Sequence, residues 1–176
     1  GRHNGIPCRI RCRKDRPFIA RWQILCYNTQ CLQDALDTQN GGIYQMLYHD
    51  SHDAQYREPL GPVAAGGRLT LRFACDESPE VLLRTWDGAE HVYPMVPAGE
   101  HLYETTITVP DKPMLFWYDF IIRWEDGDVR YGNSRDQLGG EGACYDGQPD
   151  SYQVTVYDPA YRTPEYLRHG IVYQIF

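Results

Sequence analysis

The sequence lacks any long hydrophobic run. Its 176 residues contain nothing close to the ~18 consecutive apolar residues that a membrane-spanning helix needs. The apolar stretch at residues 18–25 is interrupted by Arg21 and lacks a small-residue cleavage site, so it does not fit a secretory signal peptide. We therefore expect no membrane partner and a cytoplasmic location.

Basic residues are also in short supply. There are 17 Lys and Arg against 24 Asp and Glu, giving a net charge of −7. Because phosphate contacts need clustered cations, this balance argues against nucleic acid as a general partner. The charge is uneven, with +4 in residues 1–40 and −11 in residues 41–176. This shift predicts a domain boundary near Gly41, after a basic leader at residues 1–40.

The leader carries no recognisable metal motif. Four of the six cysteines lie there, spaced C-x3-C and C-x4-C, whereas zinc sites usually show C-x2-C pairs with well-placed histidines. This spacing fits four free cysteine thiols in a poorly ordered segment better than it fits a zinc site. The leader shows no sustained period, although residues 22–36 could form a short helix, and its arginines suit either an anionic partner or a solvated segment. Cys75 ends an alternating strand and reads as a small buried apolar residue.

Two other binding signals are weak. The glycine-rich segment 132–142 has no lysine of the phosphate-loop type, so it does not indicate a nucleotide site. Asp50, His52 and Asp53 form a polar group that could hold calcium, although their spacing is not that of an EF-hand. Solvated loop side chains are the alternative, and we predict no cofactor.

What the sequence does contain is a succession of short alternating segments from residue 43 onward. Apolar and polar residues alternate over 68–75, and residues 114–124 are apolar on both faces, as in a central strand. Asp87-Gly88 and Asp126-Gly127 are hairpin signals, and residues 132–149 read as one loop. The predicted strands are 43–49, 68–75, 80–86, 90–96, 101–109, 114–124, 129–131 and 151–157.

Seven or eight strands at this spacing, with no strong helix, predict an all-β fold of the immunoglobulin-like β-sandwich type. We place the sandwich at residues 41–158 and a linker at residues 159–176. The linker ends in Gly170-Ile171-Val172-Tyr173-Gln174-Ile175-Phe176, an uncharged run typical of a strand buried on both faces. Nothing follows to cover this run, so we expect the sequence to be the front part of a longer protein.

The same residues carry a resemblance. Asp158-Pro159 and the segment 163–167, leading into Tyr173-Gln174-Ile175-Phe176, resemble the junction between an N-terminal β-sandwich and the first strand of the catalytic (β/α)8 barrel in the α-amylase family of glycoside hydrolases. Further segments are similar to the amylopullulanase- and neopullulanase-like members: 49–51, 56–61, 131–133, 138–140 and 152–157.

The resemblance implies an α-glucan substrate and a retaining mechanism with a carboxylate nucleophile and a carboxyl acid/base. In this family both lie on later barrel strands, so we assign no catalytic residue here and expect this chain alone to hydrolyse no starch. Some relatives bind calcium in this domain, and a homodimer is possible. By the same resemblance, the loop containing Tyr131, Asn133, Gly139 and Gly140 would dock the sandwich on its own catalytic barrel.

Exposed aromatic rings beside polar groups bind the apolar faces of sugars, so Trp86, Trp117 and Trp124 are our carbohydrate-binding candidates. Trp86 precedes a hairpin turn, whereas Trp117 and Trp124, on the central strand, could instead pack in the core. Two other readings stay open beside the accessory domain of an α-glucan hydrolase. These are an autonomous α-glucan-binding module and a structural sandwich without a ligand.

Overall fold

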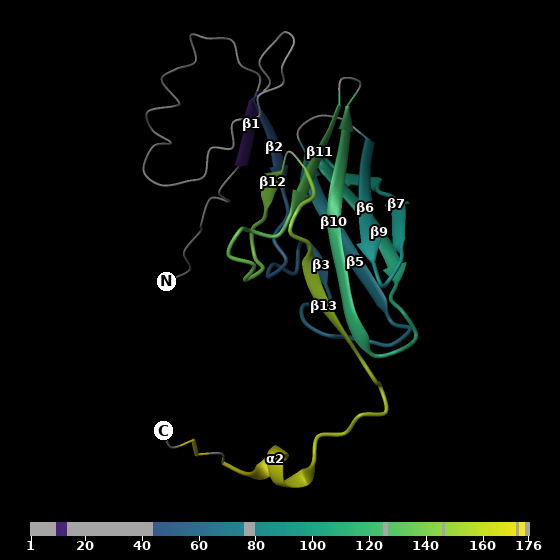
Figure 1. Ribbon diagram of the computed structural model, residues 1–176, viewed down its shortest axis with the longest axis vertical. Coiled ribbons are helices and arrows are strands. Elements are labelled where there is room, and N and C mark those ends of the chain that lie inside the picture. The colour runs from purple at the N-terminus through teal and green to yellow at the C-terminus, as the bar shows by residue number, and fades with distance from the viewer. Residues whose placement is uncertain are drawn as a thin grey trace.

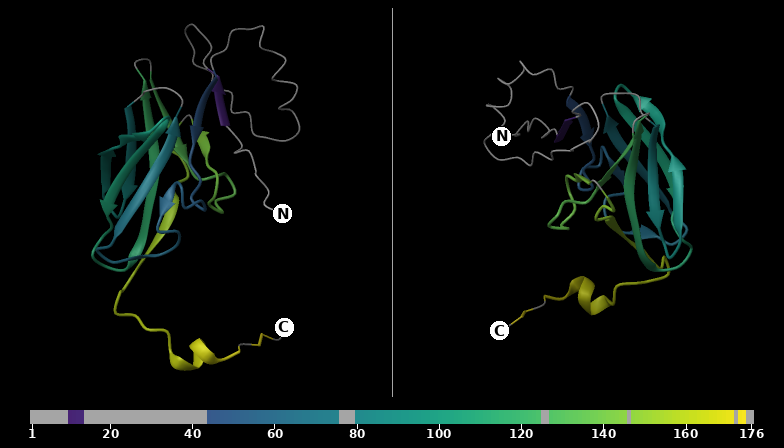
Figure 2. Two further views of the ribbon diagram at one scale, coloured as in Figure 1. Left: turned by 180° about the vertical axis from the view of Figure 1, so that it is seen from behind. Right: turned by 45° about the horizontal axis from the view of Figure 1, so that its top comes forward.

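The computed structural model describes residues 10–13, 44–75, 80–124, 127–145, 147–171 and 173–174. Two β-sheets lie face to face and enclose one core, so the chain is an all-β sandwich, as the alternating pattern predicted (Figures 1 and 2). The segment after residue 157 leaves the sandwich at its lower end in Figure 1.

The first sheet has the strand order β1-β2-β5-β9-β8, and β3 pairs with the first half of β5, at Thr70 and Leu71. All the pairings in this sheet are antiparallel. Its strands are β1 (Ile10–Arg13), β2 (Tyr44–Tyr48), β3 (Arg57–Glu58), β5 (Arg68–Cys75), β8 (Val96–Gly99) and β9 (Leu102–Thr108).

The second sheet is organised around the long strand β10 (Met114–Trp124). One edge of β10 pairs with β6, and the other edge pairs with β13 in its first half and β11 in its second half. The central position predicted for this apolar segment is confirmed. The remaining strands of this sheet are β4 (Val63–Ala64), β6 (Glu80–Trp86), β7 (Glu90–Pro94), β11 (Gly127–Gly132), β12 (Ala143–Tyr145) and β13 (Tyr152–Tyr157).

The core lies between the two sheets and is built from alternate side chains of the facing strands. On β5 the side chains in the core cluster are those that the alternation predicted, and β10 contributes every second side chain from Phe116 to Ile122 in the same way. Cys75 is buried, as expected. The inward residues of these two strands are Leu69, Leu71, Phe73, Cys75, Phe116, Tyr118, Phe120 and Ile122.

The prediction of one returning strand at residues 90–96 is wrong in one respect. The chain divides there into β7 in one sheet and β8 in the other, with buried Met95 between them. Residues 97–99, which lie between the predicted strands 90–96 and 101–109, belong to β8 and contain a bulge between Pro97 and Gly99. The turn comes later, at Glu100 and His101, where His101 has a φ of 57°.

Two segments outside the predicted strands also contain short strands. The segment 132–149 includes β12, which pairs with β11, and the segment 57–62 includes β3 before a cis peptide bond at Glu58–Pro59. Neither strand has enough residues to produce an alternating pattern of its own, so sequence periodicity could not reveal them.

Beyond the sandwich, α2 (Glu165–His169) is a short exposed helix that the sequence pattern did not predict. The described residues of the final apolar run, namely 170, 171, 173 and 174, lie outside both sheets and are exposed, so the barrel strand predicted there stays a prediction. The helix considered at 22–36 lies outside the described residues. No helix in the described part of the chain is long and apolar enough to cross a membrane.

Candidate functional site

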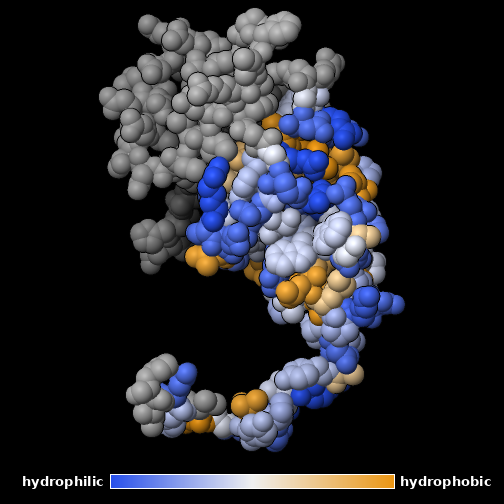
Figure 3. Space-filling model, viewed as in Figure 1, coloured by the Kyte–Doolittle hydropathy of each residue, from blue (hydrophilic) through white to orange (hydrophobic). Residues whose placement is uncertain are grey.

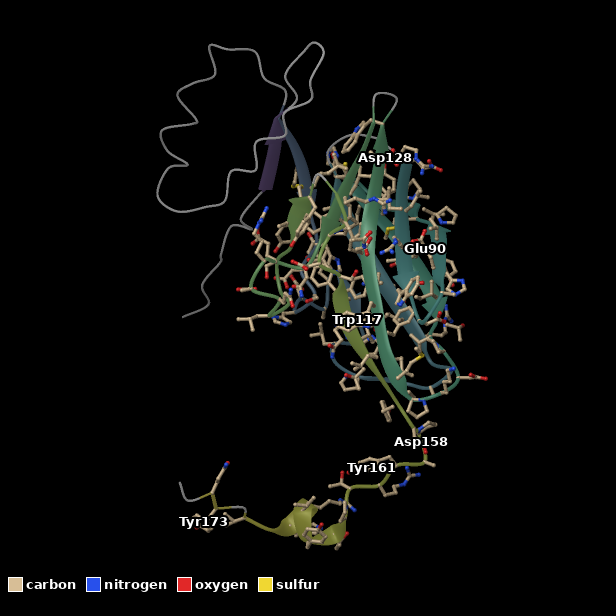
Figure 4. The ribbon with its side chains drawn as sticks, in the orientation of Figure 1. Glu90, Trp117, Asp128, Asp158, Tyr161 and Tyr173 are labelled. Carbon is tan, nitrogen blue, oxygen red and sulfur yellow. The ribbon has the colours of Figure 1, made fainter. Side chains whose placement is uncertain are left out.

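The strongest candidate surface is the outer face of β6 and β10. Strand alternation turns Arg84 and Trp86 of β6 to the same side as Trp117 and Asp119 of β10, away from the core. Trp86 and Trp117 are direct cross-strand partners in the antiparallel register, and Trp86 is 44% exposed. Trp117 is labelled in Figure 4 on β10, and Glu90, the cross-strand partner of Trp86, lies nearby on β7.

The two indole rings border a cavity of about 420 Å³. The other side of this cavity is formed by the segment just before β13. In the space-filling view this side of the molecule has a mixed surface, with polar blue regions and apolar orange ones (Figure 3). The residues that line the cavity are Arg84, Trp86, Trp117, Gln148, Pro149, Asp150 and Ser151.

Two residues that line this cavity, Arg84 and Ser151, belong to a hydrogen-bonded ionic group. The Arg84 guanidinium donates from Nε to Glu90 Oε2 and from Nη1 to Asp119 Oδ2, each at 2.8 Å. The Ser151 hydroxyl donates to the same Asp119 oxygen, also at 2.8 Å. Because the guanidinium is held by two carboxylates, it has a fixed position beside the rings.

The electrostatics of this group follow from burial and from its partners. Burial opposes the charge of Arg84, but the hydrogen bonds and charges of Glu90 and Asp119 raise its pKa above the ordinary value. Burial raises the pKa of the Asp119 carboxyl, and the hydrogen bond from Ser151 and the charge of Arg84 oppose that shift. A charged arginine is therefore retained next to two aromatic rings.

This arrangement is suited to binding a carbohydrate. Flat aromatic rings can stack on the apolar face of a sugar ring, while a fixed guanidinium and neighbouring amide and carboxylate groups can bind its hydroxyls. Asp119 is enclosed and paired with Arg84, so it is not placed like a catalytic carboxylate that contacts substrate. The geometry at this cavity therefore supports binding of a carbohydrate, with no catalytic role for Asp119.

Trp124 lies apart from the other two tryptophans. It occupies an inward position of β10, is partly buried and packs against the core, and its Nε1 has no hydrogen-bond partner among the described residues. The structure thus brings two of the three predicted tryptophans together at one cavity and places the third against the core.

The residues predicted to dock a catalytic barrel lie on β11 and the loop that follows it. Tyr131 and Asn133 are buried, and the Asn133 side-chain oxygen accepts a hydrogen bond from the Gly139 amide. Gly139 and Gly140 have φ values of 81° and 78° and lie against the His52 ring. These contacts hold the loop on the sandwich, and the docking role stays a prediction.

The residues considered for calcium make hydrogen bonds within their own turn. Asp50 Oδ1 accepts from the His52 amide and Asp53 Oδ1 accepts from the Gln55 amide, both at 2.8 Å. Over the residues that the structure describes, no group of three or more His, Cys, Asp or Glu side chains is placed to hold a metal ion.

Two features were not predicted from the sequence: the Arg84–Asp119 ion pair beneath this surface, and the buried His49. Asp119 stands as a single carboxylate inside the apolar run of β10, and Arg84 stands alone inside the apolar run of β6. A lone charge in each of two neighbouring strands was an available signal for a buried ion pair. His49 was the other omission, and its partners are far away in the sequence.

Comparison with known proteins gives a partial relationship. No protein-family model matches the chain. Amylopullulanases from Thermoanaerobacter thermohydrosulfuricus and Thermoanaerobacterium saccharolyticum are each 31% identical over 147 residues, covering 78% of this chain. The amylopullulanase of Thermoanaerobacterium thermosulfurigenes is 31% identical over 148 residues. The chain spans only 10%, 12% and 8% of these relatives, respectively. The sequence is therefore related to a segment of amylopullulanases, which confirms that part of the resemblance.

Proposed function

We propose that this chain is an accessory β-sandwich of a glycoside hydrolase that acts on α-glucans, and that it binds the glucan on the outer face of β6 and β10. Two facts support the first part: the relationship to amylopullulanases, and the small fraction of those proteins that the chain covers. The second part rests on the Trp86–Trp117 pair beside the fixed Arg84 guanidinium.

The side chains point to a particular mode of binding. An α-glucan chain presents glucose rings in succession, and two neighbouring indoles offer two apolar contacts for such a chain. Arg84 can donate to sugar hydroxyls at the cavity, and Asp150 and Gln148 lie on its opposite wall. In this proposal the sandwich of residues 41–158 holds or extends substrate binding for a catalytic barrel reached through residues 159–176.

The test is titration calorimetry of the purified chain with maltoheptaose and with pullulan. Trp86→Ala and Trp117→Ala should each weaken binding about tenfold, since each removes roughly 1.4 kcal/mol of stacking and burial. Leu115→Ala is the matched control. It removes an exposed apolar side chain, 50% accessible, from the same face of β10, and should leave affinity unchanged.

The remaining readings are separated by the same titrations. An unaltered chain that binds neither glucan would leave a structural sandwich as the better description and would overturn the binding proposal. Equal losses in Leu115→Ala and in the tryptophan variants would show that the effect is not stacking on this pair.

A further inference from the structure

A second cavity, also of about 420 Å³, lies on the other side of β13 from the tryptophan pair. Gln153 on β13 is the cross-strand partner of Trp117, so the two cavities share one face of the sheet. The second cavity is formed by β13 and the segment 51–62, and its lining residues are Ser51, His52, Arg57, Leu60, Gly61, Pro62, Gln153 and Thr155.

Arg57 is the distinctive residue of this cavity. Only 7% of its surface is exposed, and its Nη2 donates to the Gly61 carbonyl at 2.7 Å. Its Nε is buried without a hydrogen-bond partner among the described residues. The guanidinium is therefore held in place with part of its donor capacity unused.

Among the described residues, no carboxylate forms an ion pair with this guanidinium. Within the described part of the chain, no Asp or Glu oxygen lies within 4.0 Å of the Arg57 nitrogens. The nearby acids have other partners: Asp50 and Asp53 accept backbone amides of their own turn, and Glu58 lies 3.8 Å from Arg72. A buried cation without a counter-ion is costly, so an anion that entered the cavity would be strongly favoured.

The charge of Arg57 also acts on its buried neighbours. Burial lowers the pKa of His49 to about 3, and the Arg57 charge adds to that effect. Burial raises the pKa of Tyr118, and the Arg57 guanidinium opposes this shift. Both influences have the sign expected of a positive charge on Arg57.

The rest of the lining suits an oxyanion on a small organic molecule. Ser51, Thr155 and Gln153 can donate hydrogen bonds, His52 adds a ring nitrogen, and Leu60 and Pro62 add apolar surface. The volume of this cavity falls within the ~300–1,000 Å³ typical of small-molecule sites. The cavity is therefore larger than an inorganic ion alone would fill.

We propose that this cavity is a binding site for a phosphate-type oxyanion, with the Arg57 guanidinium as its principal ligand. The lining of this cavity has both polar and apolar residues, which suits a sugar that carries a phosphate group. The position of the cavity, on the same face of the sheet as the tryptophan pair, is consistent with a sugar ligand. The proposal stands whether or not the neighbouring surface binds a neutral glucan.

The test is calorimetric titration of the chain with inorganic phosphate, glucose 6-phosphate and glucose at constant ionic strength. Phosphate and glucose 6-phosphate should bind, and glucose should not bind at this site. Tighter binding of glucose 6-phosphate than of phosphate would identify a phosphate ester as the better ligand, and equal binding would identify the free oxyanion. Failure of both phosphate and glucose 6-phosphate to bind would overturn the proposal.

Variants locate the effect. Arg57→Gln should abolish anion binding, but it also removes the contact with Gly61 that holds the loop. Thr155→Glu avoids this difficulty, because it places a carboxylate in the cavity from an exposed position, and it should weaken phosphate binding at least tenfold. Thr108→Glu adds the same charge on β9 of the other sheet as the matched control. Equal affinities of the two Glu variants would contradict the site.

Discussion

The His49 imidazole lies wholly inside the sandwich, and its hydrogen bonds fix its protonation. Nδ1 is 2.7 Å from the Arg72 carbonyl oxygen, which can only accept, so Nδ1 carries the proton. Nε2 is 3.0 Å from the Tyr118 hydroxyl and accepts from it. A neutral histidine therefore satisfies both neighbours, and a second proton on Nε2 would displace the Tyr118 donor.

This burial predicts a pH-dependent stability. Burial lowers the pKa of His49 from 6.5 to about 3 in the folded protein. Between these values the unfolded chain binds a proton that the folded chain does not, so the free energy of unfolding falls as the pH falls. The contribution of His49 is about 1.4 kcal/mol per pH unit, or about 2 kcal/mol between pH 6 and pH 4.5.

Urea unfolding at several pH values, compared between the wild type and His49→Gln, isolates this contribution. The variant should lose stability at pH 7 but should show a smaller fall in stability toward pH 4.5. Asp119 and Glu141, whose pKa values are raised mainly by burial, act in the opposite direction in both proteins and cancel in the comparison. Parallel stability curves for the two proteins would contradict a neutral buried His49.

At the residue scale, sequence reasoning could identify side chains but not their partners. Trp86 and Trp117 were both candidates, yet their pairing depends on the register between β6 and β10. The partners of His49 are separated from it by 69 and 82 residues, in Tyr118 and Tyr131. Such contacts follow from the folded topology, which local periodicity does not encode.

At the scale of elements, the loop after β11 is fastened to the turn after β2. The Tyr131 hydroxyl donates to the His49 carbonyl and accepts from the Gly142 amide, at 3.2 and 3.1 Å. The Gly140 amide donates to the Ser51 hydroxyl at 2.8 Å. Gly142 allows this close approach because a Cβ there would lie 2.1 Å from the Tyr152 hydroxyl and 2.2 Å from the Gly132 carbonyl.

Gly142→Ala should therefore destabilise the protein by about 2–3 kcal/mol, since the methyl group forces apart backbone and a buried ring. Gly147→Ala is the matched control, because a Cβ at that position meets nothing within 4 Å. Chemical denaturation measures both changes. A loss of stability in Gly147→Ala equal to that in Gly142→Ala would show that crowding at the fastened loop is not the cause.

Periodicity predicted the long strands and failed on the short ones for a physical reason. β5 has one mainly buried face, so alternation marks its extent, whereas β6 and β10 are buried on both faces over much of their length and stand out as long apolar segments. β7 and β8 are edge strands with exposed side chains on both faces, and the crossing between sheets at Met95 depends on tertiary packing. No local signal distinguishes that crossing from a continuous strand.

At the scale of the whole molecule, both cavities are lined by residues on the outer face of the β10 sheet, and the other face of that sheet covers the core. Composition and motif similarity predicted an all-β sandwich related to amylopullulanases, and the structure and comparisons confirm this much. The arrangement of an aromatic pair next to a guanidinium that has no carboxylate partner among the described residues could not be predicted, because it needs β6, β10, β13 and the segment 51–62 in place together.

The most direct test of the glucan-binding account is an NMR titration with maltoheptaose that follows the assigned indole N–H signals. The account predicts that the signals of Trp86 and Trp117 shift together and saturate with one affinity, whereas the signal of Trp124, packed against the core, stays in place. Unchanged signals for Trp86 and Trp117 at saturating maltoheptaose, or a shift confined to Trp124, would contradict it.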